Sequence, residues 1–138
     1  LFYLERLTLS NVLQFNSNTE LLGLMLDMRK NPILLFIWFG PVLWIGIALY
    51  EELVREFILT SLWKWSENFI WVIVVILFSS IIIGLAHWSQ GSYGMVTIGI
   101  KSLISGYFFY KNKRLMPLVY AHVLYDGIQV AILLLTYP

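Results

Sequence analysis

The feature that most constrains this chain is an uncharged run from Pro32 to Leu49 that ends directly at a charged cluster. The cluster reads Tyr50-Glu-Glu-Leu-Val-Arg-Glu56 and holds three of the eight acidic and one of the nine basic residues of the chain. Carboxylates within apolar membrane spans are costly, so they face a protein interior or water and usually serve a function. The run therefore predicts a membrane helix, and its charged end is a candidate site.

The composition is typical of a membrane protein. Apolar residues make up 59% of the 138 residues, charged residues only 12%, and the mean hydropathy is +0.78. Soluble domains carry about 25% charged residues. The net charge of +1, with no basic patch, argues against a nucleic-acid partner. The absence of cysteine excludes a disulfide framework, an iron–sulfur site and a thiol nucleophile.

The first 31 residues differ from the rest of the chain. We assign residues 1–31 to N-terminal interfacial helices, the second of which runs from Thr19 to the basic pair Arg29-Lys30. Asn31-Pro32 ends this segment. The chain opens on Leu1 rather than Met, so we expect it to be a piece of a longer protein with earlier spans.

We predict that residues 32–138 form the transmembrane core. Uncharged or sparsely charged stretches predict helices at about 33–62, 69–88, 93–110 and 117–135. Gly40-Pro41 predicts a kink in the first of them. The fold class is all-α, a polytopic bundle of about four transmembrane helices plus the N-terminal interfacial helix. The positive charges of the loops predict that the loops with Lys64 and Lys113 lie on the cytoplasmic side of the membrane.

Two acidic residues and an arginine lie on one turn of the first helix. Glu51 lies four residues before Arg55 and Glu52 lies three residues before it, so both glutamates are within reach of Arg55 on a helix. Two carboxylates that share a guanidinium can ionise differently. Such an arrangement makes a general base from glutamate.

Both histidines of the chain lie in apolar helices. His122 and Asp126 share a helix face, so the carboxylate can orient the imidazole. His87 ends the second helix, where it can hold a water or pass on its proton. Glu51 would deprotonate that water, and His122 with Asp126 would face the developing oxyanion. Straight helices would place these groups at different depths, so a single site requires a strongly tilted or broken helix.

Three short motifs in this order resemble the CPBP (ABI) family of intramembrane proteases, which includes the type II CAAX prenyl endopeptidases and bacteriocin self-immunity proteins. They are Glu51-Glu52 with Arg55, Ile83-x-x-x-His87, and His122-x-x-x-Asp126. The resemblance covers about residues 40–135. Two positions depart from the family pattern. Arg55 falls four rather than five residues after Glu51, and Ile83 stands where the family has phenylalanine.

The resemblance implies an intramembrane endopeptidase in which Glu51, Glu52, Arg55, His87, His122 and Asp126 are the catalytic residues. Its substrate would be a membrane-associated peptide or lipidated protein of the prenylated CAAX type, and its place a bacterial plasma membrane. We favour a mechanism without a cofactor. Zn²⁺ bound by Glu51, His87 and His122 is the alternative, although no His-Glu-x-x-His helix is present.

Other readings of the same residues stay open. The chain could be a non-catalytic membrane protein, such as a bacteriocin self-immunity factor or a bundle that binds haem through His87 and His122. Lys101 and the carboxylates could also line an ion or proton pathway. The charges that follow Leu49 could be no more than the polar belt of a helix that leaves the membrane.

Overall fold

The structure, a computed structural model, describes residues 23, 26–66 and 68–136. Most of the predicted N-terminal interfacial segment therefore lies outside the described residues. Residues 26–28 are helical and end in a turn. The described chain then forms α3 (Pro32–Ile37), η1 (Trp38–Leu49), α4 (Tyr50–Trp63), α5 (Phe69–Ala86), η2 (Trp88–Gln90), α6 (Gly91–Asn112) and α7 (Met116–Thr136).

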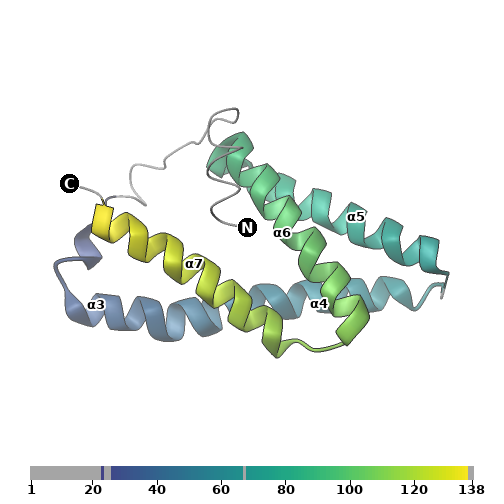
Figure 1. Ribbon diagram of the computed structural model, residues 1–138, viewed down its shortest axis with the longest axis horizontal. Helices are drawn as coiled ribbons and strands as arrows, with labels where there is room; N and C mark the ends of the chain where they lie inside the picture. The colour runs from purple at the N-terminus through teal and green to yellow at the C-terminus, as the bar shows by residue number, and fades with distance from the viewer. Residues whose placement is uncertain (1–22, 24–25, 67, 137–138) are drawn as a thin grey trace. The chain divides into compact units, whose positions relative to one another are not determined.

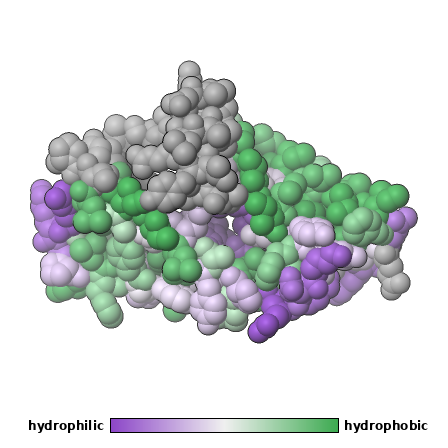
Figure 2. Space-filling model, in the orientation of Figure 1, coloured by the Kyte–Doolittle hydropathy of each residue, from purple (hydrophilic) through white to green (hydrophobic). Residues whose placement is uncertain are grey.

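The described residues contain helices and no strand, which confirms the all-α class (Figure 1). Within the described part of the chain, three helical stretches are long and apolar enough to cross a membrane: Pro32–Trp63, Phe69–Ala86 and Met116–Leu135. The helix α6 has the length of a span but a more polar sequence, with Lys101 in its middle. Apolar side chains are widely exposed (Figure 2), for example Phe36 at 76% and Ile70 at 70%. Such exposure suits contact with lipid, and the chain is an integral membrane protein.

The first span begins and bends where the sequence predicts. The side chain of Asn31 accepts hydrogen bonds from the backbone N–H groups of Ile33 and Leu34, and Pro32 occupies the first helical turn. At Gly40 the backbone leaves helical geometry, with φ −87° and ψ −109°, directly before Pro41. Proline lacks a backbone N–H, so the ladder of hydrogen bonds is interrupted there.

The segment η1, from Trp38 to Leu49, has π-helical geometry on either side of the break at Gly40. The backbone N–H of Tyr50, for instance, donates to the carbonyl of Ile45, five residues earlier. Helices of this wider type are rare and occur often at functional sites. This geometry was not predicted from the sequence, and it directly precedes Glu51 and Glu52.

The chain divides into two compact units. The α5/α6 unit contains Arg55–Lys113, and the α7 unit contains the described residues before Arg55 together with the chain from Arg114 onward. Helix α4 runs from one unit into the other. In the α7 unit, α7 packs beside η1 (Figure 1). Its core is formed by Leu43, Ala48, Val119 and Val123.

In the α5/α6 unit, small residues allow α5 and α6 to pack closely. A Cβ atom added at Gly84 would lie 2.6 Å from the carbonyl oxygen of Met95 and 3.3 Å from Cα of Gly99. Close packing of this kind is a main source of helix association in lipid. The hydroxyls of Ser79 and Ser80, buried on α5, donate to the carbonyl of Ile76 and so are satisfied within their own helix.

We expect Gly84→Ala to destabilise the fold by about 1–3 kcal/mol, because the added methyl group meets backbone atoms that cannot move aside without separating the helices. The measurement is reversible unfolding in mixed micelles. Gly46→Ala is the matched control, since a Cβ there has no neighbour within 4 Å. Equal stabilities of the two variants would contradict the close packing of α5 on α6.

Candidate active site

A cluster of four ionisable side chains lies in the α7 unit, where the start of α4 meets α7. Glu51 and Glu52 come from the first turn of α4. His122 and Asp126 come from one face of α7, one turn apart. His122 Nδ1 lies 2.8 Å from Glu52 Oε1, and its Nε2 lies 3.2 Å from Asp126 Oδ2 and 3.7 Å from Glu51 Oε2. One imidazole is therefore surrounded by three carboxylates.

The two glutamates are neighbours in the chain but have opposite environments. The side chain of Glu52 is 2% exposed, whereas that of Glu51 is 41% exposed. Consecutive helix residues differ by about 100° around the axis, so one points inward and the other remains open. Glu52 can only position its partner, and Glu51 is the carboxylate that a water or substrate can reach.

The contact with Glu52 fixes the orientation of the His122 ring. A carboxylate accepts hydrogen bonds, so Nδ1–H of His122 donates to Glu52. The other nitrogen, Nε2, then faces Glu51 and Asp126. A second group that holds one ring nitrogen so that the other can act is a common arrangement in catalytic sites. Glu52 was predicted as a partner of Arg55, and its link to His122 was missed because the two residues lie 70 positions apart.

His87 and Arg55 belong to the α5/α6 unit, whereas the cluster belongs to the α7 unit. His87 is the residue that caps α5 at its C-terminus, so the helix ends at Ala86, two residues before its predicted end at residue 88. Its Nδ1–H donates to the carbonyl of Ile83 at 2.8 Å, which leaves Nε2 as an acceptor in the neutral ring. Arg55 is 7% exposed on α4.

The proposed zinc ligands Glu51, His87 and His122 come from two different units. Within the part of the chain that the structure describes, no group of three or more His, Cys, Asp or Glu side chains has an arrangement that could hold a metal ion. The carboxylates near His122 instead contact the ring itself.

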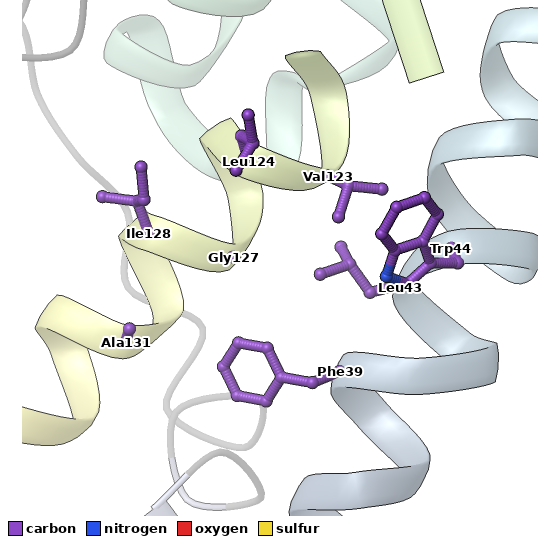
Figure 3. A pocket seen from close by; sticks show the side chains of 8 residues that line it. All are labelled: Phe39, Leu43, Trp44, Val123, Leu124, Gly127, Ile128 and Ala131. Atoms are coloured by element: carbon purple, nitrogen blue, oxygen red, sulfur yellow. The ribbon is translucent and has the colours of Figure 1, made fainter. Parts of the chain in front are cut away.

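An apolar hollow of about 250 Å³ lies between η1 and α7 in the same unit as the cluster. Figure 3 shows Phe39, Leu43 and Trp44 on one side of it and α7 on the other. Gly127, which directly follows Asp126, keeps the hollow open on the α7 side. A Cβ atom there would lie 3.5 Å from Leu43 Cδ2 and 3.8 Å from Phe39 Cε1. All the side chains that line the hollow are apolar: Phe39, Leu43, Trp44, Val123, Leu124, Ile128 and Ala131.

Comparison with known proteins agrees with the motifs. No curated protein and no solved structure matches the chain. A family model described as type II CAAX prenyl endopeptidase Rce1-like matches residues 33–128, a range that contains both glutamates, both histidines, Arg55 and Asp126. The match covers more than half of the 138 residues. The chain therefore belongs to the type II CAAX prenyl endopeptidase Rce1-like family.

Proposed function

We propose that the chain is an intramembrane endopeptidase that hydrolyses a peptide bond of a membrane-associated substrate with a water activated by Glu51. The observation that carries this proposal is the contrast within the cluster. A buried Glu52 holds Nδ1 of His122, and the exposed Glu51 lies 3.7 Å from Nε2 on the opposite side of the same ring. The chain has no cysteine, and no serine belongs to the cluster, so water is the nucleophile that fits.

In the proposed reaction, Glu51 accepts a proton from water while the water oxygen bonds to the carbonyl carbon of the substrate. The resulting oxyanion is stabilised by an Nε2–H of His122, so the ring carries both protons in this step, and Glu52 and Asp126 hold it in place. The C–N bond then breaks, and the proton held by Glu51 passes to the leaving amine. Each turnover consumes one water and regenerates the glutamate. His87 would assist by holding the water or relaying its proton, and Arg55 by balancing the charge of the glutamates.

The apolar hollow supports a lipid-modified substrate of the CAAX type. An isoprenoid or acyl chain that moves from the bilayer into the hollow exchanges one apolar surrounding for another, and the side chains that the described residues place in its lining are all apolar. It lies against the helix that carries His122 and Asp126, so a lipid seated there would tether the peptide close to the reacting groups. We place the enzyme in a bacterial plasma membrane.

We expect Gly127→Leu to raise KM for a lipidated peptide about tenfold, because the added side chain fills part of the hollow. Cleavage of the same peptide without its lipid should change little. The matched control is Gly46→Leu, at a position where a Cβ meets no neighbour within 4 Å. Steady-state kinetics on the two peptides measures the effect. An equal loss on both peptides would show that the hollow does not hold the lipid.

Cleavage of a quenched, lipidated peptide by the purified protein in H₂¹⁸O tests the reaction class. We expect one ¹⁸O atom in the new carboxyl terminus after a single turnover, as attack by water requires. Activity that survives a strong chelator supports the metal-free mechanism, whereas loss that added Zn²⁺ restores supports the zinc alternative. Failure to cleave any lipidated peptide, with the protein folded, would overturn the proposed function.

A further inference from the structure

An aromatic cluster lies at one end of the α5/α6 unit. At this end α4 and α6 finish and α5 begins. The ring of Trp63, the last residue of α4, stacks on Phe109 at 6.1 Å and meets Tyr110 edge-on at 5.6 Å. Phe69, the first residue of α5, lies 6.2 Å from Tyr110. The spans that end at Trp63 and begin at Phe69 place this cluster at a membrane surface, where aromatic residues gather beside lipid headgroups.

Two lysine ammonium groups lie on these rings. Lys113 Nζ is 4.3 Å from the ring centre of Trp63 and 4.9 Å from that of Tyr110. Lys111 Nζ lies about equally far from Tyr107 and Tyr110, at 5.9 and 6.0 Å. Contacts of this kind hold the cations in place without neutralising their charge. Among the described residues, neither lysine forms an ion pair with a carboxylate.

One N–H donor in this aromatic cluster lacks an acceptor. The indole N–H of Trp63 is buried and has no hydrogen-bond partner among the described residues. Desolvation beside the rings lowers the pKa of Lys113. The backbone of Lys113 is left-handed, with φ 52°, and its N–H donates to the carbonyl of Phe109, so the backbone of Lys113 is fixed at the helix end. Two cations and one unsatisfied N–H donor thus belong to the same aromatic cluster.

We propose that Lys111, Lys113 and the Trp63 ring form a binding site for the phosphodiester headgroup of an anionic membrane phospholipid. A phosphodiester supplies only acceptor oxygens and negative charge, which matches the two cations and the unsatisfied donor. The ends of the candidate spans at Trp63 and Phe69 put the site near a membrane surface. The loop charges predict that this surface is the cytoplasmic one, where anionic lipids attract basic residues. This inference does not depend on the proposed protease activity.

Two lysines near a helix C-terminus would also stabilise the helix dipole, so the test must separate lipid binding from folding. The full chain is exchanged into phosphatidylglycerol or phosphatidylcholine, and retained lipid is counted by native mass spectrometry. We expect phosphatidylglycerol to be retained preferentially. In Lys111→Gln/Lys113→Gln that preference should fall about fivefold for each lysine removed, at unchanged helical content by circular dichroism.

Matched variants sharpen the result. Lys30→Gln removes a lysine that pairs with Asp27 at 3.9 Å, and it should leave the preference intact. Lys113→Arg keeps the cation on the rings and should retain it, whereas Trp63→Phe, which removes the indole N–H, should weaken it. Displacement of the lipid by millimolar inorganic phosphate would show that the site selects a free anion instead. An unchanged preference in the double variant would overturn the proposal.

Discussion

Glu51→Gln is expected to lower kcat about 10³-fold on a lipidated peptide, with KM little changed. Glutamine keeps the shape and size of the side chain but cannot accept a proton from water. General-base catalysis contributes about 10²–10⁴-fold to the rate of a reaction. Because the lost interaction forms only in the transition state, the effect falls on kcat. Glu51 is the right carboxylate for this test because it is 41% exposed beside His122, whereas Glu52 is 2% exposed.

Two further variants define what the Glu51 result means. Glu51→Asp retains the carboxylate but withdraws it by one methylene, and we expect a loss of about 10²-fold, as a displacement of about 1 Å predicts. Asp27→Asn removes a carboxylate that pairs with Lys30 at 3.9 Å, and it should cleave normally. Cleavage by Glu51→Gln at the unmodified rate would reject Glu51 as the base.

Glu52→Gln is expected to lower kcat about 10²-fold to 10⁴-fold, although this side chain is too buried to touch substrate. Its carboxylate holds Nδ1–H of His122 at 2.8 Å and so decides which ring nitrogen faces Glu51 and Asp126. Loss of an orienting carboxylate disturbs the tautomer of a catalytic histidine and costs activity of this order. Glutamine can still accept this bond through its own oxygen, but it can also turn its NH₂ group toward the ring.

The role of Glu52 as a positioning residue has a signature apart from activity. In ¹⁵N spectra of histidine-labelled protein, Glu52→Gln should shift the ring resonances of His122 and leave those of His87 unchanged, because His87 bonds to the carbonyl of Ile83. Glu51→Gln should shift the His122 resonances less than Glu52→Gln does, because the Glu51 carboxylate lies farther from the ring, at 3.7 Å. Normal kcat together with an unshifted His122 would contradict the positioning role.

Much of the fold follows from local sequence. Pro32 starts a helix because Asn31 caps it, Gly40-Pro41 bends it, and Asn68 caps α5 by accepting from the N–H of Ile70. These features depend on residues within about four positions of one another, as helical hydrogen bonds do. The pairing of His122 with Asp126 has the same origin, since residues four apart share a helix face.

The sequence by itself determined that this is an apolar, helical membrane protein whose few ionisable residues include a glutamate pair and a His-x-x-x-Asp turn. Only the tertiary structure decided that Glu52 is buried against His122 while Glu51 stays open. Glu52 and His122 lie 70 positions apart, and no short sequence pattern signals their contact. It depends on how α7 packs beside the π-helical segment before α4, and such packing follows from side-chain volumes across the whole interface rather than from any short pattern.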